Sequence, residues 1–207
     1  MTKTMVALLS GSGSTLQNLN DRIADGSLPD WRISMVISSR SDAYGIVRAQ
    51  NAGIPYAVVS AAKKSASSFS RKVWDVIKPL KPDLVVMAGW MSFLIIPDEY
   101  CGKVVNIHPA LIPSFCGRGM YGHHVHEAVV RAGMKITGCT VHFADNEYDH
   151  GPIILQKAVE IDDKMSADDV AERVQAAERI AYPEAIRLFG EGRLLIDGRI
   201  VRRLEPV

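Results

Sequence analysis

The sequence has little cysteine, no long apolar run and almost no net charge. Its three cysteines (Cys101, Cys116 and Cys139) are odd in number and show no C-x-x-C spacing, which argues against a disulfide framework and a zinc knuckle. With 24 Lys+Arg against 23 Asp+Glu, the formal charge is +1, so nucleic-acid binding through a general basic excess is not expected. Apolar runs such as Leu84–Met87 are far shorter than the roughly 18 residues of a membrane helix. Residues 1–4 show no signal-peptide pattern. We therefore expect a cytoplasmic protein with reduced cysteines, whose partners are neither nucleic acids nor membranes.

Length and composition predict one globular domain with a sizeable core. The chain has 207 residues, of which 47% are hydrophobic and 23% are charged, and a domain usually has about 100–200 residues. We expect a single domain over residues 1–207, in which residues 190–207 form a small C-terminal ribbon or tail. The Asp197-Gly198 pair lies between apolar residues and predicts a hairpin turn in that ribbon.

Short apolar runs alternate with segments of helical periodicity along most of the chain. Apolar runs without polar alternation are typical of strands that are covered on both faces. The sequence therefore predicts an α/β, Rossmann-like fold with a mostly parallel twisted sheet and helices on both faces, in which ligands bind at the carboxyl ends of the strands. The predicted strands are residues 5–10, 33–38, 56–59, 84–87, 104–107, 139–143 and 153–158, and the predicted helices follow residue 14 or cover residues 44–52, 73–80, 125–132 and 167–188.

Two segments carry specific local expectations. Ser166 is placed to cap the last long helix, with Asp168 in its first turn, and Pro183 is expected to kink or end that helix. The low-complexity stretch 61–70 (AAKKSASSFS) is interpreted as a surface connection that moves.

A glycine-rich loop follows the first predicted strand. It reads Gly11-Ser12-Gly13-Ser14-Thr15, at a place where the N–H groups of a helix N-terminus point towards an anion. The loop lacks the third glycine of a dinucleotide fingerprint and the Gly-Lys-Ser/Thr of a P-loop. It therefore favours a monophosphate over NAD or ATP, with an ordinary tight turn as the alternative.

The segment Asn106-Ile107-His108-Pro109 ends a predicted strand at the ligand-binding edge of the sheet. Alternation along the strand places Asn106 and His108 on the same side. An amide donor stabilises an oxyanion and an imidazole handles a proton, which suits acyl transfer. No Ser or Cys nucleophile stands in a recognisable elbow, so direct attack of one substrate on the other is favoured. A structural His-Pro turn is the alternative.

Asp149 lies in an acidic loop between two predicted strands. Such loops are often only solvated turns. If this loop folds back over the strand that carries His108, a carboxylate in it would hold an imidazolium and support proton relay. Asp149 is the best placed of the acids, because Gly151-Pro152 follows it.

The cluster of His123, His124 and His126 invites a metal interpretation. No cysteine lies nearby, and Glu127 is the only acid close by, so a full ligand set is not completed. We expect no metal, and we interpret the cluster as the polar start of a helix or as a surface that faces phosphate.

Taken together, these segments resemble the folate-dependent phosphoribosylglycinamide formyltransferases, also called glycinamide ribonucleotide transformylases, of the formyltransferase superfamily. The resemblance covers nearly the whole chain, whereas the N-x-H-P segment alone is shared by the wider superfamily. The segments that carry it, in the order of the family, are LLSGSGSTLQNL, VISSRSDAYGIVRAQNAGIP, PDLVVMAGWMSFL, VVNIHPALIPSF, GCTVHFADNEYDHGPIILQ and RVQAAERIAYPEAIRLF.

The resemblance implies transfer of the formyl group of 10-formyltetrahydrofolate, as a co-substrate, to the amine of glycinamide ribonucleotide in de novo purine synthesis. It implies a catalytic set of three residues, a phosphate and ribose site, a folate site and one supporting histidine. The catalytic set is Asn106, His108 and Asp149; the phosphate and ribose site is Gly11, Ser12, Gly13, Ser14, Thr15, Gln175 and Glu178; the folate site is Met91, Ser92, Phe93, Leu94, Val104, Ala144 and Asp145; and the supporting residue is His142.

The chain departs from the family pattern at three places. Thr15 stands where the family loop usually has Asn, although a hydroxyl still donates to phosphate. Ser92 stands where many members carry an Arg that meets the glutamate tail of folate, so Arg71 is an alternative contact for that tail. Residues 116–126 (CGRGMYGHHVH) form a longer stretch, which is interpreted first as a longer loop, with a reshaped entrance or a phosphate contact through Arg118 as alternatives.

Two other functions stay open. A formyltetrahydrofolate deformylase delivers the formyl group to water, but that family has an extra domain before the glycine loop, whereas the first predicted strand here begins at Met5. A catalytically inactive folate- or nucleotide-binding module would be favoured if Asn106, His108 or Asp149 were missing. The sequence leaves a monomer and a homodimer open.

Overall fold

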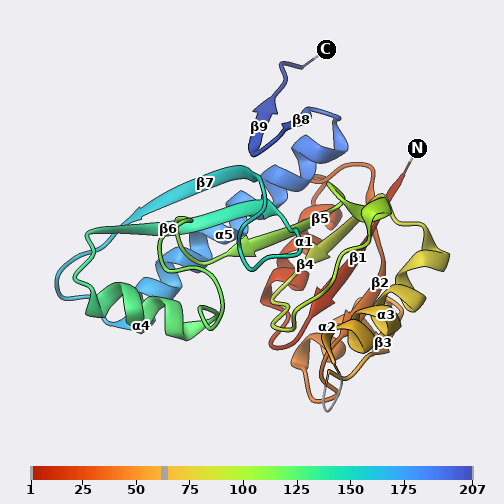
Figure 1. Ribbon diagram of the computed structural model, residues 1–207, viewed down its shortest axis with the longest axis horizontal. Coiled ribbons are helices and arrows are strands. Elements are labelled where there is room, and N and C mark those ends of the chain that lie inside the picture. Colours follow the sequence, from red (N-terminus) through yellow and green to blue (C-terminus); the bar gives the residue numbers. More distant parts are fainter. Residues whose placement is uncertain (1, 62–64, 207) are drawn as a thin grey trace. The chain divides into compact units, whose positions relative to one another are not determined.

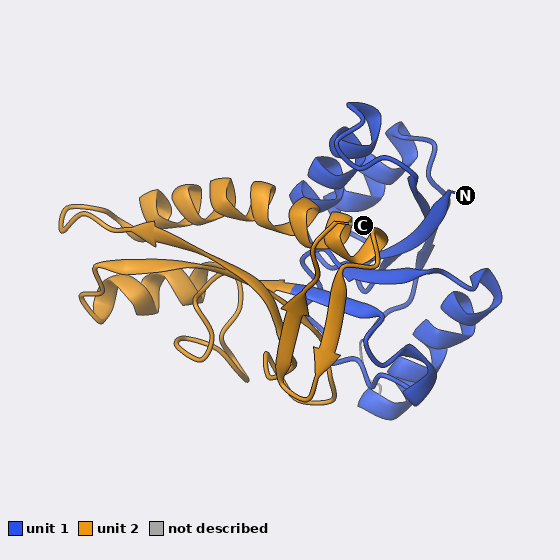
Figure 2. Cartoon of the chain, turned by 90° about the horizontal axis from the view of Figure 1, so that it is seen from above, with its two compact units in different colours: residues 1–106 blue, residues 107–207 orange. Residues whose placement is uncertain are grey.

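The computed structural model describes residues 2–61 and 65–206. Its contacts divide the chain into two compact units, unit 1 over residues 1–106 and unit 2 over residues 107–207, which Figure 2 colours separately. The elements of both units are labelled in Figure 1. No helix in the described ranges is long and apolar enough to cross a membrane.

Unit 1 is built from parallel strands in the order β3-β2-β1-β4-β5. The strands are short, and β1 and β4 are buried along most of their length, as expected for apolar runs without alternation. The last strand, β5, runs from unit 1 into unit 2. The strands are β1 (Lys3–Leu9), β2 (Trp31–Ser38), β3 (Tyr56–Val58), β4 (Leu84–Met87) and β5 (Val104–His108).

Helices cover both faces of the strands of unit 1. They are α1 (Ser14–Ala24), α2 (Tyr44–Asn51) and α3 (Ala66–Ile77), with two short 3-10 helices, η1 (Lys78–Leu80) and η2 (Asp98–Tyr100). Right-handed crossovers place α1 and α2 on one face, and the reversal of strand order at β1 places α3 on the other. This reversal brings the ends of β1 and β4 side by side, where ligands of such sheets bind.

Unit 2 contains an antiparallel pair covered by a long helix. β6 (Ile136–Phe143) and β7 (Ile153–Glu160) pair antiparallel, with a register shift between Val141 and His142. Helix α5 (Ala167–Gly190) packs on both strands and against α4 (His123–Arg131). The chain ends in the hairpin of β8 (Leu194–Asp197) and β9 (Ile200–Arg203), and β9 also pairs with β7.

The sequence predicted most of this architecture. The α/β class, the mostly parallel pairing and the alternation of strands and helices are confirmed. The Ser166 side chain accepts a hydrogen bond from the Asp169 N–H and caps α5 as expected. The expected C-terminal hairpin is also present, with its turn at Gly198-Arg199, one residue beyond the Asp197-Gly198 pair that predicted it.

Two local expectations were wrong in part. Of the two outcomes expected at Pro183, a kink or an end of the helix, the end does not occur, because α5 continues to Gly190. Proline removes one hydrogen bond of the helix, and this loss is offset because Pro183, Tyr182 and Ile186 are all buried. Within residues 61–70, Ala66 begins helix α3, Phe69 is buried and the Ser65 hydroxyl caps the helix by accepting from the Ser68 N–H. Residues 62–64 lie outside the described residues.

Candidate active site

His108 ends strand β5 and lies almost fully buried, with 3% of its surface exposed. Its Nε2 is 2.8 Å from the carbonyl oxygen of Phe115. Because a carbonyl only accepts hydrogen bonds, this contact requires a proton on Nε2. The other ring nitrogen, Nδ1, lies 3.5 Å from Oδ2 of Asp149. The imidazole is therefore held between two acceptors.

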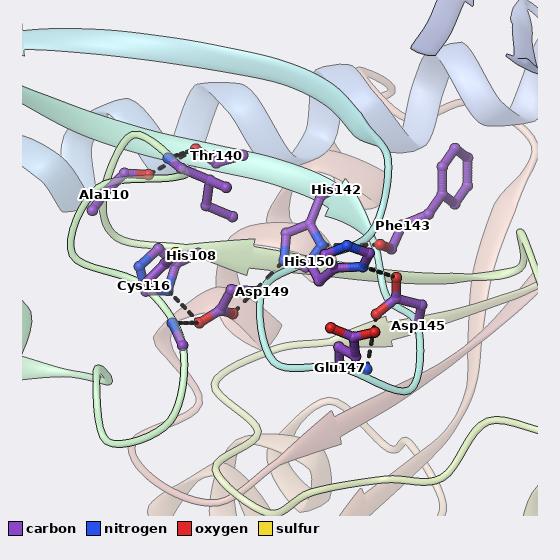
Figure 3. A network of polar contacts seen from close by, with 12 residues as sticks. His108, Ala110, Cys116, Thr140, His142, Phe143, Asp145, Glu147, Asp149 and His150 are labelled. Carbon is purple, nitrogen blue, oxygen red and sulfur yellow. Dashed lines mark hydrogen bonds and ion pairs between the residues drawn. The ribbon is translucent and has the colours of Figure 1, made fainter. Parts of the chain in front are cut away.

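Asp149 lies between two histidines, as Figure 3 shows. Its Oδ2 faces His108 and also accepts a 2.9 Å hydrogen bond from the Gly117 N–H. Its Oδ1 is 3.9 Å from Nε2 of His142. The backbone of Asp149 has φ +50°, a left-handed conformation that Asp adopts more readily than most residues. The expected meeting of Asp149 with His108 is present in the structure.

His142 is buried beside Asp149 but does not compete for its charge. Burial is the main cause that lowers the pKa of His142, so this imidazole stays neutral near pH 7. Its Nδ1 donates to the carbonyl oxygen of Phe143 at 2.9 Å. Asp149 thus lies between a neutral His142 and the Nδ1 side of His108.

The loop that carries Asp149 is fixed by a connected set of polar contacts. His150 Nδ1 lies 2.8 Å from Oδ2 of Asp145, and Asp145 Oδ1 accepts from the Glu147 N–H at 2.9 Å. Arg199, in the turn between β8 and β9, donates to both Nε2 and the carbonyl oxygen of His150. A Cβ at Gly151 would collide with the carbonyl oxygen of Phe143, so only glycine fits there. Through its contacts with His150 and the Glu147 N–H, Asp145 fixes the conformation of the loop that carries Asp149.

The segment after His108 is fixed by a buried hydroxyl. Thr140 Oγ1 donates to the Ala110 carbonyl at 2.7 Å and accepts from the Ile112 N–H at 3.0 Å. Gln156, opposite Thr140 in the β6–β7 register, donates to Thr140 Oγ1 and to the Ile112 carbonyl. Sequence reasoning missed Thr140, Gln156 and Arg199, because polar residues in strands and turns carry no motif of their own.

Residues 116–126 do more than lengthen a connection. Gly117 donates to Asp149, and the preceding Phe115, with φ +49°, offers its carbonyl to His108. Burial and the nearby Asp149 raise the pKa of the Cys116 thiol, which keeps it protonated. Arg118 is exposed. In this structure the segment therefore supplies a backbone contact to Asp149, and the residue just before it, Phe115, supplies the contact to His108.

The three clustered histidines have different surroundings. His123 and His124 are exposed at the start of α4 near Glu127, whereas His126 is buried. Burial, followed by the nearby His123 and His108, lowers the pKa of His126 to about 4. In the described ranges, no group of three or more His, Cys, Asp or Glu residues is arranged to hold a metal ion.

In unit 1, the residues expected at the phosphate lie where β1 meets α1. Gly13, with φ +71°, is the N-cap of α1, and Ser14 and Thr15 form the first turn of the helix. The Gly11 carbonyl accepts from the Gly45 N–H at 3.0 Å, which ties the loop to α2. The residues expected in the loop thus form a helix N-terminus that is free of side-chain capping bonds.

The expected folate segment is joined to the end of β1. Ser10 lies immediately before the glycine loop, and its buried hydroxyl accepts hydrogen bonds from the Met91 N–H at 3.0 Å and from the Ser39 hydroxyl at 2.7 Å. Met91 is exposed, whereas Leu94 and Val104 are buried. Ser92 and Phe93 are half-buried, as is Ala144 in unit 2.

The remaining expected residues lie at the end of β5 and on α5. Asn106 is half-buried in the strand that carries His108, opposite Met87 of β4. On α5, Gln175 is exposed and Glu178 is half-buried, and residues three apart share a helix face. Burial raises the pKa of Glu178 to about 7.

Comparison with known proteins gives the same family as the sequence motifs. The family model described as formyl transferase matches residues 3–186. Phosphoribosylglycinamide formyltransferase of Haemophilus influenzae is 37% identical over 96% of this chain and 92% of its own length. The trifunctional purine biosynthetic protein adenosine-3 of Bos taurus is 38% identical over 95% of this chain, which spans only 19% of that longer protein.

A solved structure is similar in both sequence and fold. Glycinamide ribonucleotide transformylase 1 from Symbiobacterium toebii is 39% identical, with a TM-score of 0.91 over 99% of this chain and 95% of that one. The match thus covers nearly all of the strands and helices described above. The chain therefore belongs to the formyl transferase family, among the phosphoribosylglycinamide formyltransferases.

Proposed function

We propose that this chain transfers the formyl group of 10-formyltetrahydrofolate to the primary amine of glycinamide ribonucleotide, the reaction of its relatives in purine synthesis. The observation that carries the mechanism is His108, which is buried between the Phe115 carbonyl and the Asp149 carboxylate. The contact with the Phe115 carbonyl requires a proton on Nε2, so the imidazole carries a fixed N–H donor. It then acts as a hydrogen-bond donor to developing negative charge.

The proposed step begins when the amine nitrogen of the ribonucleotide attacks the formyl carbon. A new C–N bond forms, and the formyl oxygen becomes an oxyanion that accepts hydrogen bonds from the Asn106 amide and from His108 Nε2–H. In this structure His108 Nε2–H donates to the Phe115 carbonyl. When the substrates bind, the formyl oxygen replaces this carbonyl as the acceptor. Collapse of the intermediate breaks the bond to N10 of the folate, and the proton lost by the amine reaches N10 through water and Asp149.

The other expected residues bind the two substrates. Gly11, Ser12, Gly13, Ser14 and Thr15 hold the phosphate, because they combine backbone N–H groups with hydroxyls at a helix N-terminus. Gln175 and Glu178 bind the phosphate and the ribose hydroxyls. His142 lies beside Oδ1 of Asp149 and helps to position that carboxyl group. The pterin is taken by a largely apolar wall and a backbone-rich loop: Met91, Ser92, Phe93, Leu94, Val104, Ala144 and Asp145.

The first test follows absorbance while the full chain is mixed with a 10-formylfolate donor, with and without glycinamide ribonucleotide. We expect loss of the donor only when the amine is present, and a loss that is about 10²- to 10⁴-fold slower with His108→Ala. The matched control is His124→Ala, because His124 is an exposed histidine of α4. Loss of the donor without the amine would identify a deformylase. Binding without loss in either case would identify an inactive binding module.

The proposal also covers where the protein acts in the cell and its oligomeric state. We place the reaction in the cytoplasm, where purine precursors are made, and expect neither nucleic acid nor membrane as a partner. Fractionation of cells that produce the chain tests the location. Sedimentation velocity, with and without both substrates, distinguishes a monomer from a homodimer.

A further inference from the structure

Arg48 is a charged residue that contacts the glycine loop from another helix. It lies half-buried on α2, and its Nε donates to the Ser12 carbonyl oxygen at 3.0 Å. Its Nη1 donates to Oε1 of Gln17 on α1 at 3.2 Å, and its guanidinium carbon lies 5.1 Å from the centre of the Tyr44 ring. Within residues 2–61 and 65–206, these contacts are all to neutral groups, so the contacting side chains leave the positive charge uncompensated.

Helix α2 touches the loop because two glycines face each other. A Cβ on Gly13 would lie 2.5 Å from the Cα of Gly45, which is far inside normal contact distance. The Gly45 N–H also donates to the Gly11 carbonyl at 3.0 Å. The loop is thus held by two consecutive carbonyls, those of Gly11 and Ser12, which both point towards α2.

The direction of these carbonyls sets the direction of the N–H groups. In a trans peptide the C=O and the following N–H point in opposite directions, so the Ser12 and Gly13 N–H groups are turned away from α2. The Gly13 carbonyl accepts from the Gln17 N–H inside the first turn of α1, which leaves the Ser14 N–H directed out of the helix end. Successive N–H groups around a left-handed glycine form a concave anion site.

We propose that Arg48 is a positioning residue for the substrate phosphate. By binding the Ser12 carbonyl, it holds the peptide between Ser12 and Gly13 in the one orientation that presents both N–H groups to an anion. It also places an uncompensated positive charge on the side of the loop that faces α2, and the loop has no lysine of its own. This inference rests on the proposed function, because it takes the glycine loop as the phosphate site. Arg48 itself does not touch the substrate.

The test measures kcat and both KM values for Arg48→Met and Arg48→Lys. Loss of charge-assisted hydrogen bonds is expected to raise the KM for glycinamide ribonucleotide by about 10- to 100-fold, with kcat and the KM for the folate changed less than about twofold. Lysine keeps the charge but lacks the planar fork, so Arg48→Lys recovers only part of the loss. The control is Arg22→Met in the last turn of α1, which removes the same charge from a residue paired with Asp25.

Two readouts separate positioning from charge alone. If Arg48 acted only through its charge, Arg48→Lys would restore the KM fully, and 0.5 M salt would erase the difference between Arg48→Met and wild type; either result overturns the proposal. A double-mutant cycle with Gln17→Met is expected to be non-additive, because Gln17 accepts from the same guanidinium. If Arg48→Met lowers the thermal midpoint too far for assay, Arg48→Lys and Gln17→Met carry the test.

A binding measurement keeps this inference separate from the proposed function. Inorganic phosphate is titrated into wild type and each variant, and the thermal midpoint is followed without any folate. We expect phosphate to stabilise wild type and Arg22→Met but not Arg48→Met. Equal stabilisation of wild type and Arg48→Met would overturn the role of Arg48 even if formyl transfer were observed. Absence of formyl transfer, with this pattern intact, would overturn only the proposed function.

Discussion

The two compact units present their candidate ligand groups in different ways. Unit 1 offers mainly backbone: the glycine loop is a helix N-terminus whose peptides are oriented by Gly45 and Arg48. Unit 2 offers titratable side chains, with the half-buried Asp149 between the buried His108 and His142. Backbone N–H and C=O groups are neutral dipoles that do not titrate. Imidazoles and carboxylates gain or lose a proton as the pH changes. Binding in unit 1 should therefore depend on shape, and turnover in unit 2 on protonation.

The largest expected effect is on the chemistry in unit 2. His108→Ala should lower kcat by about 10²- to 10⁴-fold, the usual contribution of a general acid or base, with little change in folate affinity. Steady-state kinetics and equilibrium binding of a folate analogue measure the two quantities separately. An unchanged kcat in this variant would remove His108 from the mechanism, while His124→Ala should behave as wild type.

A second effect of protonation in unit 2 concerns stability. The pKa of His126 is about 4 in the folded chain, against 6.5 for an ordinary histidine, so the unfolded chain binds a proton first as pH falls. The free energy of unfolding should therefore decrease between about pH 6.5 and pH 4, by on the order of 3 kcal/mol from this residue. His126→Gln, which does not titrate, should remove that part of the decrease.

Urea unfolding at pH 7.5, 6.0, 5.0 and 4.5 checks this prediction as the difference between wild type and His126→Gln. Titration of all other groups cancels in that difference when the two sites are independent. A difference that stays constant over this range would show that His126 titrates normally in the folded chain.

A change of shape in unit 1 should impair binding without altering the chemistry. Gly13→Ala places a methyl group against the Gly45 backbone and strains a φ of +71°, so α2 has to move away from the loop. We expect the KM for glycinamide ribonucleotide to rise at least tenfold and the free energy of unfolding to fall by about 2 kcal/mol. The kcat at saturating substrate should be nearly unchanged.

Gly53→Ala is the matched control for this change. Gly53 has φ +65° but nothing within 4 Å of an added Cβ, so it reports the backbone strain without the collision. Equal losses in the two variants would show that the contact between the loop and α2 does not matter for phosphate binding.

The smallest expected effect is at one hydroxyl of the loop. Thr15→Ala should raise the KM for the ribonucleotide about three- to tenfold, because one neutral hydrogen bond to phosphate is lost in ground and transition states alike. Thr15→Ser keeps the hydroxyl and should restore the wild-type KM. A drop in kcat with an unchanged KM would contradict the assignment of the loop to phosphate.

Local pattern was enough to predict the elements, but it failed where packing opposed it. The helical periodicity after residue 14, and the capping residue Ser166, predicted helices that are present. Pro183 was expected to kink or end α5, yet the helix continues to Gly190, with buried neighbours on both sides of the proline. Phe69 was assigned to a surface connection, although it is buried in the first turns of α3. In both cases tertiary burial outweighed a local preference.

The sequence by itself determined the α/β fold, the glycine loop at a helix N-terminus and the strand that carries Asn106 and His108, because each depends on periodicity or on neighbours along the chain. Only the tertiary structure decided that the Phe115 carbonyl and Asp149 meet the two nitrogens of His108, that Arg199 ties down His150, and that Arg48 orients Ser12. These contacts join residues from different elements. Their geometry depends on how strands and helices pack, and no local pattern encodes that packing.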